Sequence, residues 1–290
     1  MPLDLRPKFA KKSLGQNFLV DKVAITKITE SIPVDTDLLL EIGPGRGALS
    51  TELISRTKTY CLLEKDDIFA KNIGETLFVN GSRNHHVFHT DALNFSWEEL
   101  WTVPGVDAKT PLVVAANLPY NVATEILFRL LELHERIPFL VLMFQKEVAE
   151  RIAGKCDTKA YGSISISVQN FYELRVQQIL KPGAFRPSPK IDSAVLEFRR
   201  REKPQVPFAN LEEFAQFRAM VKIAFSHRRK TLENTLDLEA HMLSWAKRLQ
   251  NKDSIRDLIA DLGWDPKIRA EKITVKEFGR LFWEIKKGKD

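Results

Sequence analysis

The sequence "LLLEIGPGRGALS", residues 38–50, joins an apolar run to a glycine-rich turn and then to an amphipathic segment. Gly43, Gly45 and Gly47 come directly after the apolar run. Glycine lets a backbone turn tightly and approach a ligand, and the first N–H groups of a following helix are free to bind it. The stretch therefore predicts a strand, a ligand-binding turn and a helix.

The same alternation continues outward through the first two hundred residues, where apolar runs bounded by turn residues alternate with amphipathic stretches. Such a pattern predicts βαβ units in an α/β fold, with a mostly parallel twisted sheet covered by helices on both faces. The predicted strands are Leu38–Ile42, Thr59–Glu64, His86–His89, Leu112–Ala116 and Phe139–Phe144, and the predicted helices are Ala48–Arg56, Asp66–Leu77 and Thr124–Leu133. Alternating residues from Ile191 to Phe198 predict a late, antiparallel edge strand.

The last third of the chain has a different pattern. The charged stretch Arg199–Pro207 contains two prolines and is typical of a linker. Helical periodicity alone follows it, in Leu211–Phe225, Leu232–Leu243, Ser254–Leu262 and Val275–Ile285, with Ser254 and Thr274 as N-cap candidates. We therefore expect an α/β domain over residues 1–203 and a small all-α domain over residues 204–290.

The composition narrows the class of protein. The 290 residues are 44% hydrophobic and 28% charged, as in an ordinary globular protein, and the net charge of +6 suits a polyanionic partner. Cys61 and Cys156 are far apart, which argues against a disulfide framework or a thiolate zinc site and favours a reducing cytoplasm. No apolar run is long enough to span a bilayer, and His85, His86 and His89 lack the further ligands of a metal site, so we predict neither membrane nor metal binding.

Two acidic residues follow later strands of the predicted sheet. Glu64 lies 21 residues after Gly43, close to the spacing at which an acidic side chain binds ribose hydroxyls in dinucleotide folds. The glycine spacing is GxGxG and not GxGxxG, which disfavours a nicotinamide or flavin cofactor. Asp91 follows the third strand, where it can accept a hydrogen bond from an adenine amino group. Together these features predict a cofactor that contains adenosine.

The fourth predicted strand ends in "AANLPYNVAT", residues 115–124. Asn117 then lies on the same sheet edge as Gly43 and Glu64. The Asn117 side-chain oxygen and the Leu118 carbonyl can accept from an exocyclic adenine amine and direct its lone pair toward a methyl donor. Pro119 fixes this corner and the Tyr120 ring can stack on the base. A plain strand-to-helix turn is the alternative interpretation.

Seven stretches carry a resemblance to a known family: "KKSLGQNFLVD" (11–21), "EIGPGRGALS" (41–50), "NLPYNVAT" (117–124), "QKEVAERIA" (145–153), "KAYGSISISVQ" (159–169), "AFRPSPKIDSAV" (184–195) and "AFSHRRKTLENTL" (224–236). From Lys11 to about Leu236 the chain resembles the KsgA/RsmA family of small-subunit ribosomal RNA adenine N6,N6-dimethyltransferases. The resemblance implies a class I, Rossmann-like methyltransferase domain with a helical C-terminal domain. It also implies S-adenosylmethionine as cofactor and two adjacent adenosines near the RNA 3′ end as target, in a monomeric enzyme that acts on pre-30S particles.

The resemblance also implies roles for particular residues. Phe185 would stack on the flipped base opposite Tyr120, while Asn117, Leu118 and Tyr120 would hold the target amine. The cofactor would be lined by Asn17, Leu19, Gly43, Gly45, Glu64, Asp91 and Asn117. RNA phosphates would be bound by Arg228, Arg229, Lys230 and Lys222, and by Lys8, Lys11 and Lys12 near the N-terminus. The stretch Ser96–Thr110 is longer than the family pattern and is interpreted as a surface insertion.

Three other functions stay open on the sequence. An Erm-type methylase of large-subunit RNA shares the Asn-x-Pro-Tyr corner, but "PSPKIDSAV" and "FSHRRKTL" favour the small-subunit enzyme. A DNA adenine methylase fits less well, because the corner of that class usually begins with Asp. A non-catalytic RNA- or DNA-binding factor would have no use for the glycine turn, Glu64 and Asn117–Tyr120.

Overall fold

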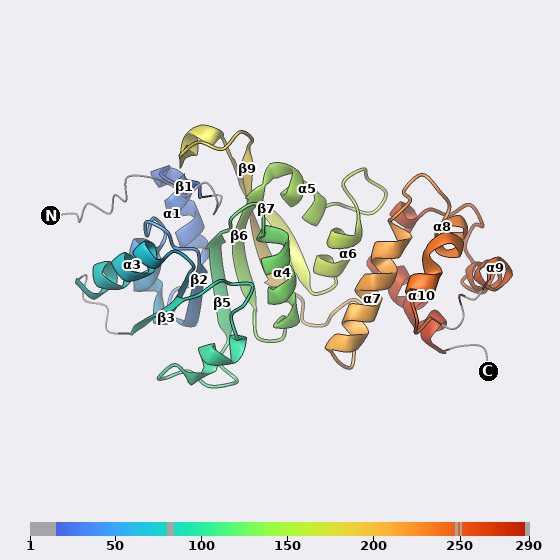
Figure 1. The fold of residues 1–290 in the computed structure, drawn as a ribbon, viewed down its shortest axis with the longest axis horizontal. Helices are drawn as coiled ribbons and strands as arrows, with labels where there is room; N and C mark the ends of the chain where they lie inside the picture. Colours follow the sequence, from blue (N-terminus) through green and yellow to red (C-terminus); the bar gives the residue numbers. More distant parts are fainter. Residues whose placement is uncertain (1–15, 80–83, 247–248, 250, 288–290) are drawn as a thin grey trace. The chain divides into compact units, whose positions relative to one another are not determined.

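A seven-stranded sheet forms the centre of the first of two compact units (Figure 1). The computed structural model describes residues 16–79, 84–246, 249 and 251–287. The strand order is β4-β3-β2-β5-β6-β9-β7, and the first five strands of this order run parallel. The strands are β2 Thr36–Ile42, β3 Thr57–Glu64, β4 His85–His89, β5 Leu112–Asn117, β6 Phe139–Gln145, β7 Tyr172–Leu180 and β9 Ser193–Arg200. The α/β class and all five predicted parallel strands are thereby confirmed.

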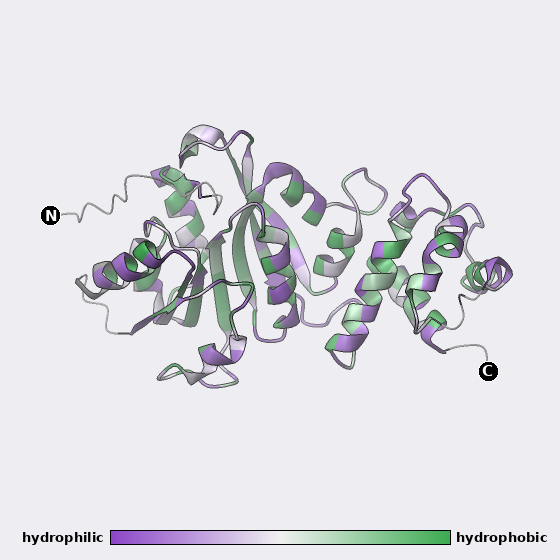
Figure 2. Cartoon of the chain, viewed as in Figure 1, coloured by the Kyte–Doolittle hydropathy of each residue, from purple (hydrophilic) through white to green (hydrophobic). Residues whose placement is uncertain are grey.

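The central strands form because both of their faces are buried. Leu38, Leu39 and Leu40 of β2 are 0% exposed, and Figure 2 shows the central strands as the hydrophobic part of the sheet. Continuous apolar runs of this kind are typical of parallel strands covered on both faces. In the register of the sheet, Ile42 is paired with Leu63 on one side and Ala116 on the other. The residues that follow these three positions therefore meet at one edge of the sheet.

Helices precede or connect most of the parallel strands. α1 Lys22–Ser31 precedes β2, and α2 Ser50–Leu53, α3 Asp67–Val79 and α4 Ala123–Glu132 connect β2 to β3, β3 to β4 and β5 to β6. Asp21 caps α1 by accepting from the Ala24 N–H at 3.0 Å. The helix predicted over Ala48–Arg56 is shorter than expected, because only four residues are α-helical before a 3₁₀ turn over Ile54–Arg56.

Two sheet features differ from the predictions. β9 is antiparallel to β6, as expected, but it is an internal strand with β7 as its other neighbour, so the edge position predicted for it is wrong. Residues 193–198 of β9 are all buried, so both faces of the sheet are covered at this strand. The edge strand is β7, which the sequence pattern did not predict. A separate two-stranded ladder joins β1 Phe18–Leu19 to β8 Phe185–Arg186.

The second unit comprises Glu150–Glu173 and the residues from Arg201 onward, and the first comprises the residues up to Ala149 with Leu174–Arg200. The helices from α5 on are α5 Lys146–Ile152, α6 Ser163–Gln169, α7 Leu211–Ala224, α8 Leu232–Glu239, α9 Lys252–Asp261 and α10 Val275–Lys287. Phenylalanine rings of α7 and α10 pack in its core, with Phe217 and Phe282 5.7 Å apart. The four predicted C-terminal helices are present, but Asn251 and not Ser254 caps α9, and Ser254 occupies the third helical position of the same capping box. Thr274 does cap α10, since its hydroxyl accepts from the Glu277 N–H.

Within the described ranges, no helix is both long and apolar enough to cross a membrane.

Candidate functional site

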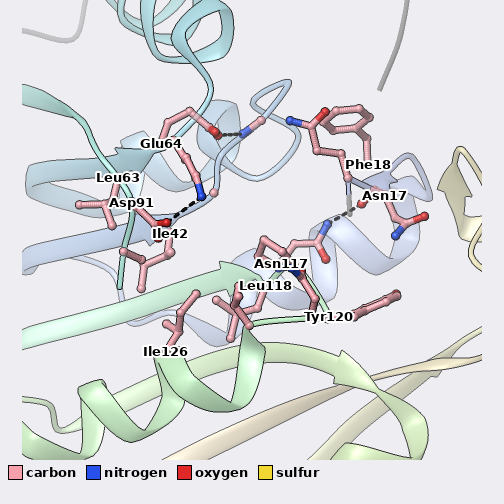
Figure 3. Close-up of a pocket in the computed structure, with 18 of the residues that line it drawn as sticks. Asn17, Phe18, Ile42, Leu63, Glu64, Asp91, Asn117, Leu118, Tyr120 and Ile126 are labelled. Carbon is pink, nitrogen blue, oxygen red and sulfur yellow. Dashed lines mark hydrogen bonds and ion pairs between the residues drawn. The ribbon is translucent and has the colours of Figure 1, made fainter. Parts of the chain in front are cut away.

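A cavity opens at the carboxyl ends of β2, β3, β4 and β5 in the first unit (Figure 3). This is the edge at which open α/β sheets bind their ligands. Its walls are apolar where Ile42, Leu63 and Ile126 contribute side chains, and polar where the strands end. Eight of the residues predicted from the sequence line it: Asn17, Gly43, Gly45, Glu64, Asp91, Asn117, Leu118 and Tyr120.

The glycine turn takes the conformation that its residues allow. Gly43 and Gly45 have φ values of +69° and +53°, in the left-handed region that favours glycine. A Cβ on Gly45 would lie 2.9 Å from the Phe18 ring, closer than carbon atoms normally approach. The turn can therefore lie against Phe18 only because residue 45 has no side chain. For the same reason, no side chain at position 45 covers the backbone of the turn where it lines the cavity.

The side chain of Glu64, the last residue of β3, binds the glycine turn that follows β2. One carboxylate oxygen accepts from the Gly45 N–H at 2.9 Å (Figure 3), and the other accepts from the Asp66 N–H, also at 2.9 Å. Burial raises the pKa of this carboxyl group, while these backbone hydrogen bonds oppose the rise. The carboxylate is held in place by the backbone and still lines the cavity.

Asp91 lies on the wall that follows β4. Its carboxylate accepts from the Leu93 N–H at 3.0 Å and from the Lys65 ammonium at 2.7 Å. Burial disfavours the charged form of Asp91, but the hydrogen bonds from Lys65 and Leu93 outweigh it and hold its pKa below the ordinary value. Asp91 is therefore an ionised acceptor at neutral pH.

The predicted amine corner lies on the opposite side of the glycine turn. The Asn117 side-chain nitrogen donates to the Asn17 carbonyl at 2.9 Å, so the side-chain oxygen is the part of the amide that stays available to a ligand (Figure 3). Leu118 is 1% exposed and lines the same cavity. Among the described residues, no donor is hydrogen-bonded to its carbonyl oxygen. The cavity is thus lined by two consecutive residues that each have an acceptor, the side-chain oxygen of Asn117 and the backbone carbonyl of Leu118.

The two aromatic residues of the prediction have different environments. The Tyr120 hydroxyl is hydrogen-bonded to the Ser193 hydroxyl at 2.5 Å, which fixes the ring at the mouth of the cavity. Phe185, in contrast, is 0% exposed and is packed in the core with Leu19 and Ala184. Its ring has no free face for a base, so the structure does not bring Phe185 to the site. Leu19 likewise lies in the core and not among the cavity residues.

Several cavity residues were not predicted. Phe18 stands between the predicted Asn17 and Leu19, and its ring packs edge-on against Phe69 at 5.3 Å. Lys65 directly follows Glu64 and reaches Asp91. Both adjoin predicted residues in the sequence, but no spacing rule indicates which neighbour faces a cavity. The stretch interpreted as an insertion is anchored and not only on the surface, because Trp97 and Leu100 are 5% and 0% exposed.

The predicted RNA-binding cations of the second unit are accessible. Lys222, Arg228, Arg229 and Lys230 are exposed, and Arg228 has an ion-pair partner in Glu271 at 3.6 Å. The cluster lies where α7 ends and the turn to α8 begins. The predicted contacts Lys8, Lys11 and Lys12 lie outside the described residues.

No group of three or more His, Cys, Asp or Glu side chains that could hold a metal ion occurs in the part of the chain that the structure describes. The cavity fits an organic cofactor instead. Its apolar walls suit an adenine ring, and the carboxylates of Glu64 and Asp91 suit ribose hydroxyls and an adenine amine. The backbone of a turn that no side chain covers suits the rest of such a molecule.

This fold and this cavity define a class I S-adenosylmethionine-dependent methyltransferase. The chain belongs to the ribosomal RNA adenine dimethylase family, whose model matches residues 8–263. The predicted enzyme class and cofactor are confirmed by this membership.

Relatives cover nearly the whole chain. A protein of Enterococcus faecalis named ribosomal RNA small subunit methyltransferase A is 38% identical over 96% of this chain and 91% of its own length. One of the same name from Geobacter metallireducens is 37% identical over 94% of both chains. The crystal structure of a dimethyladenosine transferase from Plasmodium falciparum has a TM-score of 0.77, with 23% identity over 93% of this chain and 98% of that one. The 23S rRNA methyltransferase ErmE has a TM-score of 0.65, at 22% identity over 93% of this chain and 99% of that one, so both structures support the fold.

Proposed function

We propose that the protein dimethylates the N6 amines of two adjacent adenosines in the 3′-terminal hairpin loop of small-subunit ribosomal RNA. The observation that carries this proposal is the opening of the Asn117–Tyr120 corner into the same cavity as Gly43, Glu64 and Asp91. An amine acceptor and a cofactor site in one cavity are what methyl transfer to an adenine requires. The name of the relatives at 37–38% identity supports the small-subunit target.

The residues that would bind the cofactor are assigned from the chemistry of the side chains that line the cavity. Glu64 would accept from the ribose hydroxyls and Asp91 from the adenine amine, and the apolar side chains of Ile42, Leu63 and Ile126, which line the same cavity, would enclose the adenine ring. Asn17, Gly43, Gly45 and Asn117 border the remaining part of the cavity, which suits the methionine portion. S-adenosylmethionine supplies the methyl group when it is bound.

The corner holds the amine of the target base. An exocyclic adenine amine is a poor nucleophile, because its lone pair is delocalised into the ring. In the first transfer the Asn117 side-chain oxygen and the Leu118 carbonyl each accept one N–H of this amine, which localises the lone pair on nitrogen. In the second transfer the monomethylated amine has one N–H left, which one of the two acceptors holds. Bound S-adenosylmethionine would supply the methyl group to the amine held in this way, with an N–C bond replacing the C–S bond of the donor. The methylated amine then gives its extra proton to water.

Base positioning depends on Tyr120. The target adenine must leave its stack before it reaches the corner, at a cost of about a few kcal/mol that is smallest in a loop. Stacking on the Tyr120 ring recovers roughly 1–3 kcal/mol. The hydrogen bond to Ser193 holds the ring in place before RNA binds, so no ordering cost is added at that step.

The exposed cations of the second unit supply the affinity for the phosphate backbone. The proposed phosphate contacts are the exposed residues Lys222, Arg228, Arg229 and Lys230. The proposed enzyme acts as a monomer on a cytoplasmic pre-30S particle. A loop adenosine of an immature particle is the substrate, since a base in a paired stem would cost more to flip.

The test uses unmethylated small-subunit RNA, as naked RNA and in immature 30S particles, with a labelled methyl donor. Mass spectrometry is expected to find N6,N6-dimethyladenosine at two adjacent positions near the 3′ end. Large-subunit RNA is the control substrate. Label on large-subunit RNA alone would contradict the proposed target, and absence of label from both RNAs would contradict the activity.

A further inference from the structure

The wall of the cavity that contains Asp91 is a tight loop that is not part of the sheet. Thr90, Asp91 and Ala92 line the cavity directly after β4 ends. The Asp91 side chain accepts from the Leu93 N–H, and its carbonyl accepts from the Asn94 N–H at 2.9 Å. These two bonds shape the loop. The Thr90 N–H, which donates to the Glu64 carbonyl at 3.0 Å, and the Lys65–Asp91 pair attach it to β3. A further group attaches it to α4, on the other side of the cavity.

Arg129 of α4 makes that attachment. Its guanidinium donates to three carbonyl groups of the loop, through Nη1 to Ala92 at 3.2 Å and to Leu93, and through Nη2 to Phe95 at 2.8 Å. The planar fork of an arginine can bind several acceptors at once, which the single ammonium of a lysine cannot reproduce. Each bond is to backbone, so the loop is held whatever its side chains are.

The stretch Ser96–Thr110 supports the guanidinium from its other side. The Trp97 ring lies beneath it, with 5.3 Å from the guanidinium carbon to the ring centroid. Trp97 packs edge-on against Phe95 at 5.4 Å, and Phe95 packs against Phe88 of β4 at 5.0 Å. The guanidinium therefore lies between loop carbonyls and a buried indole, which limits its rotamers.

The same helix also carries the other wall of the cavity. α4 begins at Ala123, three residues after Tyr120, and its Ile126 lines the cavity. Arg129 lies one turn further along α4. One rigid element thus joins the amine corner at its start to the Asp91 loop near its end.

We propose that Arg129 is a positioning residue that sets the distance between the Asp91 loop and the amine corner, with the stretch Ser96–Thr110 supporting it through Trp97. The inference rests on the cofactor placement of the proposed function, since Asp91 must contact the adenosine portion. Arg129 itself does not line the cavity. Its effect is on how well the adenosine subsite is formed before the cofactor binds.

The test compares four variants of the full-length chain by isothermal titration with S-adenosylmethionine. Arg129→Met is expected to weaken binding about tenfold, because three loop carbonyls lose their donor and the Asp91 wall relaxes. Arg129→Lys is expected to give an intermediate affinity. The matched control is Arg56→Met, since the Arg56 guanidinium also donates to backbone carbonyls, of Ile32 and Glu30, but is not at the cavity. Asp91→Ala checks the cofactor placement without reference to Arg129.

Steady-state kinetics separate positioning from general stability. Arg129→Met is expected to raise KM for S-adenosylmethionine about tenfold while kcat at saturating cofactor changes less than threefold, roughly as expected for a loss of ground-state binding. Equal affinity loss in Arg56→Met would show a general stability effect and overturn the inference. Normal affinity in Arg129→Met beside weakened affinity in Asp91→Ala would also overturn it. Normal affinity in Asp91→Ala would instead reject the cofactor placement, and the inference with it.

Discussion

The side-chain nitrogen of Asn117 donates to the backbone carbonyl of Asn17, 100 residues earlier in the chain, at 2.9 Å. This bond decides which end of the amide faces the cavity, because a carbonyl can accept only from the nitrogen. The oxygen of Asn117 is therefore oriented toward a ligand by a neighbouring residue that lines the same cavity. A turn residue without a functional role would need no such orientation.

Replacement of Asn117 by Ala is expected to lower kcat for methyl transfer about 10²–10³-fold, the usual cost of removing one preorganised polar partner of a transition state. Affinity for RNA is expected to stay unchanged, because the phosphate contacts belong to other residues. Single-turnover methylation and filter binding measure the two quantities. Asn117→Asp is the companion variant: it keeps an oxygen, loses the donor to Asn17, and is expected to be nearly as slow. Normal turnover in Asn117→Ala would refute the amine-acceptor role.

We expect that the ring of Tyr120 positions the target base and that its hydroxyl contributes less. Tyr120→Ala is expected to weaken productive RNA binding by roughly 1–3 kcal/mol, the value of one stacked base. Tyr120→Phe keeps the ring and loses only the bond to Ser193, so its activity is expected to fall less than about tenfold. Fluorescence of a 2-aminopurine at the target position reports flipping in both variants. Equal loss in both would assign the role to the hydroxyl and its Ser193 partner instead of the ring.

Most of the sheet edge could be predicted from the sequence, because short-range rules determine it. Apolar runs predict parallel strands, and the carboxyl ends of such strands meet at one edge, which placed Gly43, Glu64, Asp91 and Asn117 together. The cavity contains all four. No knowledge of long-range packing was needed for this part of the site.

Long-range packing determined the parts that were not predicted. β9 is an internal strand only because β7 pairs beyond it, and the alternating pattern of residues 191–198 does not indicate that neighbour. Phe185 looks like an aromatic residue of a binding motif, but the ladder between β1 and β8 places its ring in the core. Arg129 contacts a loop 34 to 37 residues earlier in the chain. Such pairings depend on tertiary structure and not on local periodicity.

Removal of Arg229 and Lys230 together is expected to weaken RNA binding and to reduce the salt dependence of the binding constant by about one to two units of slope. Both side chains are exposed, whereas Arg228 shares its charge with Glu271. Arg228→Ala is therefore expected to have a smaller effect on the slope. Lys58→Ala, which removes one exposed cation of the first unit that is paired with Asp37, is the charge control. An unchanged slope in the double variant would make the cluster an ordinary solvated surface.

A buried acid beneath the glycine turn is expected to make stability depend on pH. Glu41 is 2% exposed and accepts from the hydroxyls of Ser50, at 2.6 Å, and Tyr60. Burial raises its pKa from 4.5 to about 7, although both hydrogen bonds oppose the rise. The folded protein thus retains a proton that the unfolded chain releases above its lower pKa. Stability from this group is complete below about pH 4.5 and is lost as the pH rises through about 7.

Glu41→Gln is neutral at every pH and is expected to remove that loss, which amounts to about 3 kcal/mol for the full shift. Urea denaturation between about pH 5 and about pH 8 measures the free energy of unfolding for both proteins. The wild-type value is expected to fall relative to that of the variant as the pH rises, with the difference levelling off above about 7. Glu52→Gln, at an exposed position of α2, is the control and should keep the wild-type slope. A wild-type slope in Glu41→Gln as well would mean that Glu41 is already ionised in the folded protein, held by the Ser50 and Tyr60 hydroxyls.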